Sequence, residues 1–293
     1  METSELLKKV RQIEIKTRGL SRNIFAGQYH SAFKGRGMAF SEVREYQYGD
    51  DIRDIDWNVT ARYNKPYIKV FEEEREMTVM LMIDVSGSLD LGTVHSTKRD
   101  IVTEMAATLA FSAIQNNDKI GVIFFSNKIE KFIPPKKGRK HILYIIRELI
   151  DFQPQNQETD IAMVLKFLTN ALKKRCTAFI ISDFLDVADF DNALTIANRK
   201  HDIVALQVYD KLDVTLPAVG LMKIADAETG EEMWIDTSSK SVRDDYNKYY
   251  EKQMMEAQHA FVKSRVDNVS MNTGGDYVKA LLTLFHKRNY MRG

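Results

Sequence analysis

Oxygen-bearing side chains occur at three places in the chain, in an order that suits binding of a hard divalent cation. Asp84, Ser86 and Ser88 form an Asp-x-Ser-x-Ser string, in which alternate residues of a tight loop can turn three oxygens toward one point. Thr159 and Asp183 follow at a distance along the chain. Mg²⁺ prefers oxygen ligands and keeps several waters when few carboxylates are present. We therefore predict a metal site at these five residues, for Mg²⁺ first, with Mn²⁺ or Ca²⁺ as alternatives.

A Mg²⁺-dependent phosphatase of haloacid-dehalogenase type is the alternative chemistry, because it too places an aspartate beside the ion at the end of a strand. That reaction needs an acid two residues after the nucleophile to protonate the leaving group. If Asp84 is the nucleophile, Ser86 stands at that place and has no proton to donate near neutral pH. No Gly-x-Ser-x-Gly string and no Walker loop occurs either. The sequence therefore favours binding over catalysis.

The candidate oxygens can meet only if the fold brings three loops to one place. Residues 78–83 form a β-prone run that ends at Asp84, which is typical of a central strand buried on both faces. Thr159 precedes a predicted helix, and Asp183 follows a predicted strand at 178–182. Ligands of parallel sheets gather beyond the carboxyl ends of the strands. All three loops should therefore lie at the same edge.

Strand-like and helix-like patterns alternate along most of the chain, which predicts an α/β fold with a doubly wound, mostly parallel sheet of Rossmann type. Residues 222–225 and 232–235 flank a turn and predict a hairpin. The other predicted strands are 120–125, 129–133 as a short edge strand, 203–208 and 269–272, and the predicted helices are 96–115, 139–151, 159–173, 190–198, 241–265 and 277–287.

The beginning of the chain has a different character. Residues 4–18 carry apolar side chains at mostly helical spacing, which predicts a short amphipathic helix. Residues 27–67, rich in glycine, arginine and aromatic residues, predict turns and short strands, and residues 67–73 alternate like a strand. We therefore expect an N-terminal helical and β appendage over residues 1–76 and the α/β domain over residues 77–293.

At the five candidate ligands the chain resembles the von Willebrand factor A family. The metal-ion-dependent adhesion site of that family has the pattern Asp-x-Ser-x-Ser, then a distant Thr, then a distant Asp, which corresponds here to Asp84, Ser86 and Ser88, then Thr159, then Asp183. The resemblance implies a von Willebrand factor A-like sheet that holds a divalent ion. With only two carboxylates around that ion, an acidic side chain of a protein partner can complete the coordination.

A second resemblance lies in residues 42–57, which read Glu-x-Arg-x-Tyr-x-x-Gly-Asp-x-x-Arg-x-Ile-Asp-Trp. This order is similar to the hallmark of the bacterial domain-of-unknown-function family fifty-eight, whose members join it to an A-type domain. Alternating arginines and carboxylates permit bidentate pairs that brace a polar hairpin. Two interpretations stay open: the segment supports the fold, or it forms part of a partner surface through Tyr46, Tyr48 and Trp57.

Composition and charge narrow the class of protein. Lys and Arg total 42 against 41 Asp and Glu, so the net charge of +1 creates no field that attracts nucleic acid. The one cysteine, Cys176, cannot form an internal disulfide, which fits a reducing compartment. The start does not read as a secretory signal, and no apolar run approaches the roughly 20 residues that span a bilayer. We expect a cytoplasmic protein that neither binds nucleic acid nor inserts into a membrane.

These features together predict a non-enzymatic, metal-dependent protein-binding adaptor. Proteins similar to family fifty-eight commonly share operons with MoxR-type AAA+ ATPases and look like partners of these ATPases. The resemblance therefore implies such an ATPase as partner and a chaperone-like role in the assembly or maturation of protein complexes. Because the chain contains no ATPase motif, any ATP hydrolysis would belong to the partner.

Overall fold

The computed structural model describes residues 3–20, 38–73, 76–90, 92, 97–154, 158–185, 189–225 and 232–292. The chain divides into two compact units, a larger one formed by Met1–Ala32 with Thr78–Gly293 and a smaller one formed by Phe33–Met77. The N-terminal helix α1 (Thr3–Leu20) packs against helices of the larger unit. The observed division therefore differs from the expected appendage over residues 1–76, because α1 belongs with the α/β domain.

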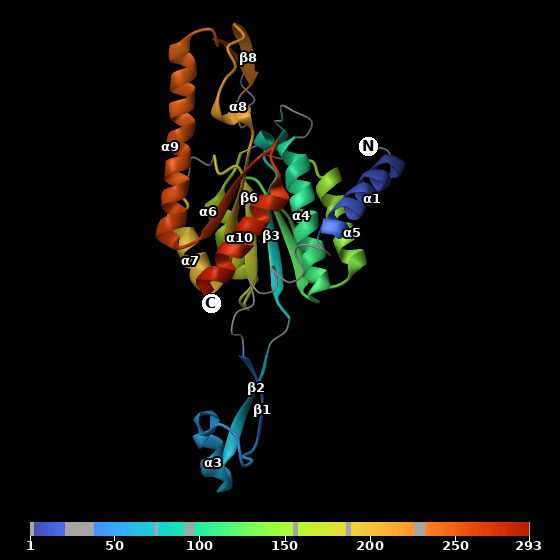
Figure 1. Ribbon diagram of the computed structural model, residues 1–293, viewed down its shortest axis with the longest axis vertical. Coiled ribbons are helices and arrows are strands. Elements are labelled where there is room, and N and C mark those ends of the chain that lie inside the picture. Colours follow the sequence, from blue (N-terminus) through green and yellow to red (C-terminus); the bar gives the residue numbers. More distant parts are fainter. Residues whose placement is uncertain are drawn as a thin grey trace. The chain divides into compact units, whose positions relative to one another are not determined.

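Six strands form the central sheet of the larger unit, in the order β10–β7–β6–β3–β4–β5 (Figure 1). Neighbouring strands run parallel except for β4 and β5, which form an antiparallel pair at one edge. This confirms the predicted doubly wound, mostly parallel α/β class. The strands are β3 (Thr78–Asp84), β4 (Lys119–Phe125), β5 (Ile129–Lys136), β6 (Thr177–Ser182), β7 (Asp202–Tyr209) and β10 (Asp267–Asn272).

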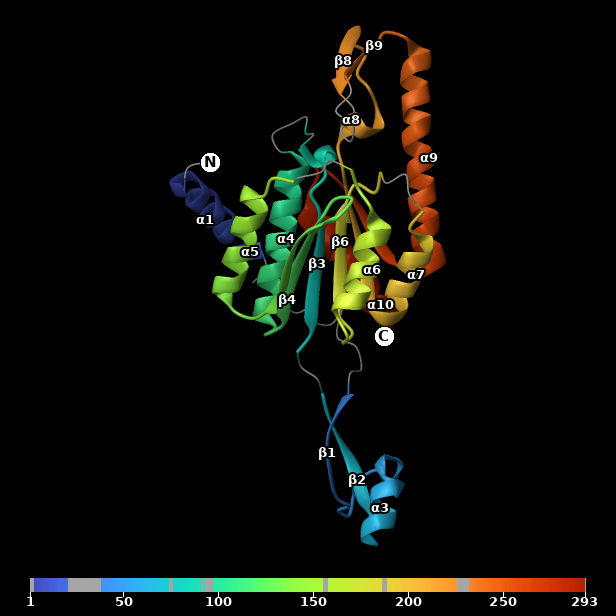
Figure 2. The ribbon, with the colours of Figure 1, turned by 180° about the vertical axis from the view of Figure 1, so that it is seen from behind.

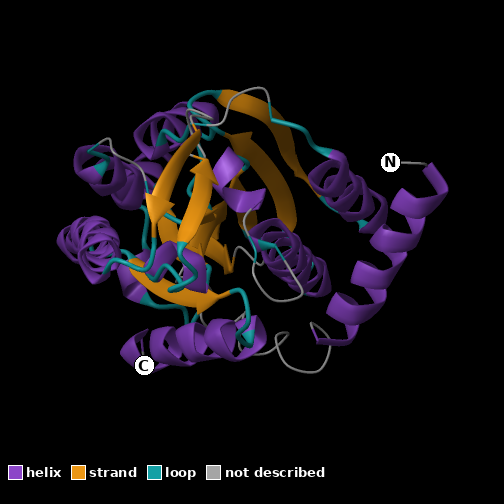
Figure 3. Cartoon of the chain, turned by 90° about the horizontal axis from the view of Figure 1, so that it is seen from above, coloured by secondary structure: helices purple, strands orange, loops and turns teal. Residues whose placement is uncertain are grey.

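Helices cover both faces of this sheet, as Figures 1 and 2 show from opposite sides and Figure 3 from above. One face packs against α4 and α10, and α5 and α1 lie beside α4. The other face packs against α6, α7 and the C-terminal part of α9. The helices are α4 (Lys98–Gln115), α5 (Arg139–Asp151), α6 (Ile161–Ala171), α7 (Asp191–Lys200), α8 (Lys211–Val214), α9 (Lys240–Ser264) and α10 (Tyr277–Arg292).

Strand β3 lies in the interior of the sheet, and its residues 79–83 have no exposed surface. A strand that is covered on both faces needs apolar residues without polar alternation, as the sequence predicted. Met80 and Met82 pack into the core formed with α6, α7 and α9, so Leu81 between them faces α4. The apolar run ends at Asp84, which places the first polar side chain at the carboxyl end of the strand.

The connection from β7 to β10 carries the predicted hairpin, formed by β8 (Leu221–Ala225) and β9 (Glu232–Asp236), followed by the long helix α9. Tyr246 of α9 donates its hydroxyl to the carbonyl oxygen of Leu212 in α8 at 2.9 Å. This bond fixes α9 to the short helix that follows β7. None of the helices in the described ranges combines the length and the apolar character that crossing a membrane requires.

The smaller unit is an antiparallel pair, β1 (Met38–Glu45) and β2 (Tyr67–Glu73), joined by a 3₁₀ turn η2 (Ile52–Asp54) and a short helix α3 (Trp57–Tyr63). The strand predicted over residues 67–73 is confirmed, whereas the helix was not predicted. Asp56 caps α3 by accepting the N–H groups of Asn58 and Val59. The helix begins at this cap and has no buried residue, so hydrophobic periodicity gave no signal for it.

Candidate metal centre

The loop after β3 begins at Asp84, whose side chain is fully buried. Its Oδ1 accepts the backbone N–H of Ser86 at 2.9 Å, which holds the loop in a tight turn that continues into a 3₁₀ helix, η3 (Gly87–Asp90). The turn brings the Oγ atoms of Ser86 and Ser88 within 3.1 Å of each other. The three candidate ligands of this loop therefore lie together.

Thr159 and Asp160 directly precede helix α6, and their side chains have different partners. Asp160 caps the helix, because its Oδ1 accepts the N–H of Met163 at 2.7 Å. Its own N–H donates to the carbonyl oxygen of Ser126 beyond β4, which ties the start of α6 to the sheet. The hydroxyl of Thr159 is therefore left to face Asp84, and it donates to Oδ2 over a long 3.4 Å.

Ser182, the last residue of β6, adds a hydroxyl that the sequence analysis missed. Its Oγ donates to Oδ2 of Asp84 at 2.6 Å and accepts the N–H of Phe184 at 3.0 Å. The contact follows from the pairing of β6 with β3, in which Ile181 lies opposite Ile83, so that the next residue of β6 reaches Asp84. Ser182 thus holds the Asp84 carboxylate in place from the neighbouring strand.

Asp183 directly follows β6 at the expected edge, but its carboxylate is already engaged. Oδ2 accepts Nζ of Lys98 at 3.0 Å, and Oδ1 accepts the N–H of Leu185 at 3.4 Å. Phe184, the next residue, has a φ of 57°, in the left-handed region that costs a side-chain-bearing residue about 1 kcal/mol or more. The backbone therefore turns sharply where it presents Asp183.

Lys98 is the first residue of α4, and the sequence analysis did not single it out. Its ammonium has no exposed surface and also binds both carboxylate oxygens of Asp213, at 2.9 and 3.1 Å. Burial alone lowers the pKa of Lys98, but the charges of Asp183 and Asp213 outweigh it, so the pKa is raised and the lysine is charged. Its partners lie 85 and 115 residues further along the chain, so no local pattern announces this group.

The buried carboxylate of Asp84 is electrostatically unfavourable as it stands. Burial, followed by the nearby negative charge of Asp183, raises its pKa from 3.8 to about 6, although the hydrogen bonds from Ser182 and Ser86 act in the opposite direction. Lys98 contacts Asp183 and Asp213, and neither of its recorded ion pairs reaches Asp84. A cation beside Asp84 would relieve this charge.

The donor set fits a hard divalent ion better than a soft one. Within the described ranges, no three or more His, Cys, Asp and Glu side chains gather as metal ligands, so a site here would depend on one carboxylate, hydroxyls and waters. Mg²⁺ accepts such a set, whereas Zn²⁺ prefers cysteine and histidine. Asp84, Ser86, Ser88 and Thr159 form the fitting group, and Asp183 contributes its charge from the side of Lys98.

The signature segment of the smaller unit contains one of the bidentate pairs that its composition permits. Arg44 donates to both carboxylate oxygens of Asp50, at 2.8 and 2.9 Å. Tyr48 and Trp57 are largely exposed, at 104% and 70%, whereas Tyr46 is half-buried. The segment therefore has an internal brace and also presents two large aromatic side chains to solvent.

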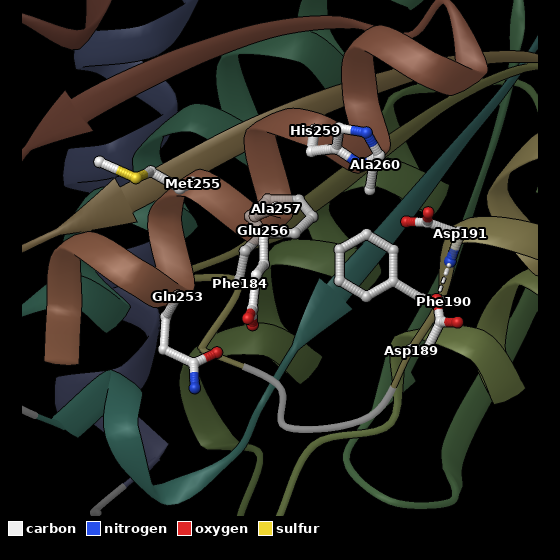
Figure 4. Close-up of a pocket in the computed structure, with 10 residues that line it drawn as sticks. All are labelled: Phe184, Asp189, Phe190, Asp191, Gln253, Met255, Glu256, Ala257, His259 and Ala260. Carbon is white, nitrogen blue, oxygen red and sulfur yellow. Dashed lines mark hydrogen bonds between the residues drawn. The ribbon is translucent and has the colours of Figure 1, made fainter.

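A cavity of about 520 Å³ lies between the loop after β6 and helix α9 (Figure 4). Its floor is apolar and includes Phe184 and Phe190, whose rings are 6.3 Å apart. Asp189, Asp191 and Glu256 stand around it, and Asp191 is paired with Lys263. Because Phe184 directly follows Asp183, this cavity adjoins the same loop as the candidate metal centre.

Sequence relatives span both the signature segment and the candidate centre. The family described as "Protein of unknown function DUF58" matches residues 42–256. An uncharacterized protein of Mycobacterium tuberculosis (strain ATCC 25618 / H37Rv) is 30% identical over 250 residues, which cover 84% of this chain and 78% of that protein. The uncharacterized protein YeaD of Bacillus subtilis (strain 168) is 25% identical over 122 residues, 42% of this chain and 27% of YeaD.

Solved structures share the architecture at low sequence identity. An aerotolerance-related membrane protein from Bacteroides fragilis NCTC 9343 superimposes with a TM-score of 0.50 at 13% identity, over 73% of this chain and 99% of that chain. The VWA domain of SpRpn10 aligns with a TM-score of 0.40 at 11% identity, over 72% of this chain and 94% of that domain. The likeness to the Bacteroides fragilis protein is one of fold. Because the family match extends over well more than half of its length, the chain belongs to the family described as "Protein of unknown function DUF58".

Proposed function

We propose that this protein is a non-enzymatic adaptor that binds protein partners through a divalent metal ion, Mg²⁺ first. The convergence of oxygens from Asp84, Ser86, Ser88 and Thr159 at the carboxyl end of β3 carries the proposal. Two of these contacts join residues that local spacing predicts, and the third joins Thr159 to Asp84 across 75 residues of chain. A fold that only needed helix caps would not aim the Thr159 hydroxyl at a buried aspartate.

The charge of the centre indicates what the partner supplies. Asp84 is the one carboxylate in the fitting group, so a bound 2+ ion would keep coordination positions for water or another oxygen. An aspartate or glutamate side chain of a partner is the protein group that suits such a position. Binding to such a partner should therefore require the metal.

Catalysis by a phosphatase mechanism lacks its second acid. If Asp84 were the nucleophile, Ser86 would hold the sequence position of the acid that protonates the leaving group, and its hydroxyl lies 3.1 Å from that of Ser88. The other buried acid at this edge, Asp183, is bound by Lys98. The centre therefore suits the binding of a partner better than phosphatase catalysis.

We further propose a MoxR-type AAA+ ATPase as the partner and the cytoplasm as the compartment, which rest on the family resemblance. The smaller unit offers a second contact surface to such a partner through Tyr48 and Trp57. Both side chains are exposed, and aromatic residues of this size are enriched among those that carry binding energy in interfaces. ATP hydrolysis would be the partner's activity, and the chain would link it to a client in complex assembly or maturation.

A pull-down from the native cell tests this function. The tagged chain should recover an AAA+ ATPase in Mg²⁺ and lose it in EDTA, and Asp84→Ala should abolish recovery in both buffers. Asp151→Ala, which changes an exposed aspartate at the end of α5, is the matched control and should bind normally. Equal recovery in Mg²⁺ and EDTA would rule out metal-bridged binding. Turnover of generic phosphate esters that disappears in Asp84→Ala would favour the phosphatase instead.

A further inference from the structure

A lysine ammonium is buried within hydrogen-bonding distance of a candidate metal-centre residue. Lys98 Nζ has no exposed surface and lies 3.0 Å from Asp183 and 2.9 Å from Asp213. The three groups come from the start of α4, the end of β6 and helix α8, so the ion pairs join segments that are distant in sequence. Asp213 also accepts the backbone N–H of Asp210, which fixes its carboxylate toward the lysine.

Stability alone is a weak reason for such an arrangement. Removing three charged groups from water costs several kcal/mol per ion before pairing offsets it, and apolar side chains of similar volume often serve a fold as well. The position of Lys98, in contact with a residue at the edge of the metal centre, indicates a role in the charge of that centre.

The charges can be counted from the residues present. Asp84, Asp183 and Asp213 contribute three negative charges and Lys98 one positive charge, so the group carries two negative charges. A divalent ion brings it to neutral. Without the lysine, the same ion would leave one negative charge, which would repel an acidic partner.

We propose that Lys98 is a specificity-determining residue of the centre: its fixed positive charge weakens metal binding and, in return, lets the metal-loaded centre accept an acidic group. This rests on the proposed function, since it concerns the same ion and the same kind of partner. Lys98 acts through Asp183 and does not itself contact the ion or the partner.

Three variants change the charge of the metal-free group in steps. Lys98→Met gives three negative charges, Asp213→Asn gives one, and the double variant returns to two. At an effective dielectric constant near 20, one charge within several ångströms changes the affinity for a 2+ ion by at least about tenfold. Lys98→Met should therefore bind metal more tightly and an acidic partner less well, Asp213→Asn should do the reverse, and the double variant should return toward the wild type.

The full chain at pH 7.5 can be titrated with Mn²⁺, followed by electron paramagnetic resonance of the free ion. Capture of an acidic group can be measured as Mn²⁺-dependent retention on immobilised poly-glutamate, with poly-lysine as the negative control. Arg288→Met controls for the loss of a buried ion pair, since Arg288 pairs with Asp202 at the opposite end of β7. This control should lose stability without changing metal affinity.

The outcomes separate the two proposals. Wild-type protein that binds no Mn²⁺ overturns the proposed function together with the role of Lys98. Wild-type binding with no opposite movement of metal affinity and poly-glutamate retention overturns the role of Lys98 alone. If Lys98→Met does not fold, Asp213→Asn and the double variant still decide, because the first must weaken metal binding and the second must restore it.

Discussion

Replacing Asp84 with asparagine should stabilise the metal-free protein while removing its response to metal. The negative charge of Asp84 destabilises the folded state, because burial and the charge of Asp183 raise the pKa of this carboxyl from 3.8 to about 6. The difference between a pKa of 3.8 and one of about 6 corresponds to about 3 kcal/mol of native-state destabilisation when the group is ionised. Asparagine removes the charge and keeps the shape.

The hydrogen bonds around Asp84 allow this substitution. The amide oxygen can accept the N–H of Ser86 as Oδ1 does now, and the amide nitrogen can donate to the hydroxyl of Ser182, which rotates to accept. The hydroxyl hydrogen that Ser182 now donates to Oδ2 loses this acceptor, and the pKa of about 6 already includes that hydrogen bond. We therefore expect Asp84→Asn to gain on the order of 2 to 3 kcal/mol of unfolding free energy in EDTA at pH 7.5.

The sign of the pH dependence follows from the direction of the shift. A carboxyl group whose folded pKa is raised contributes stability that is fully present below its unfolded pKa near 3.8 and is lost as the pH rises through about 6. The difference between Asp84→Asn and wild type should therefore be near zero below pH 4 and reach its full size above pH 6.

Urea denaturation in EDTA, with and without Mg²⁺, across this pH range measures the effect. Mg²⁺ should raise the unfolding free energy of the wild type and leave the variant unchanged. Asp151→Asn, which changes an exposed aspartate at the end of α5, is the control and should change neither the unfolding free energy nor its response to Mg²⁺. An Asp84→Asn protein that is less stable than wild type in EDTA at pH 7.5 would refute the reasoning.

Three further predictions concern the scaffold. Burial lowers the pKa of His201 from 6.5 to about 4. The stability that the neutral imidazole contributes is therefore complete above pH 6.5, and it falls by about 3 kcal/mol as the pH drops through about 4. His201→Gln should make the urea midpoint less dependent on pH in this range. Thr97→Ala removes the capping box of α4 and should cost about 1 kcal/mol, seen as a lower urea midpoint with an unchanged m-value. Gly121→Ala would place a Cβ 2.8 Å from the carbonyl oxygen of Ile133 in the paired strand β5, so we expect a melting temperature lower by several degrees in calorimetry.

Most of the fold was predictable because its elements have strong periodic patterns. The helix at Arg139–Asp151 matches its predicted bounds, and its buried residues Ile142, Ile145, Ile146 and Leu149 have the spacing of one helical face. The segments that were missed, α3 and α8, are short and begin at capping aspartates. Elements of one or two turns cannot show an apolar period, so capping chemistry is the signal that would have found them.

In the candidate centre, too, the residues that local spacing brings together were predicted, and two residues that depend on distant contacts were not. Asp84, Ser86 and Ser88 lie together because their spacing requires it, and Thr159 follows from the order of the strands. Ser182 and Lys98 were missed because their contacts depend on which strand neighbours which and on how α4 packs. Whether the five predicted ligands hold a metal stays a prediction.

The long connection between β7 and β10 has a consequence for how the chain folds. These two strands are neighbours in the sheet, yet the hairpin and α9 lie between them in sequence, so their pairing closes a large loop. Pairing between strands far apart in sequence is slow, because closing the loop between them costs chain entropy. Until β10 arrives, the apolar strand β7 presents an unpaired edge, which is the kind of surface that pairs with other chains. Folding intermediates of this protein should therefore be most prone to mispairing at β7, and the speed with which α9 docks sets how long that edge stays open.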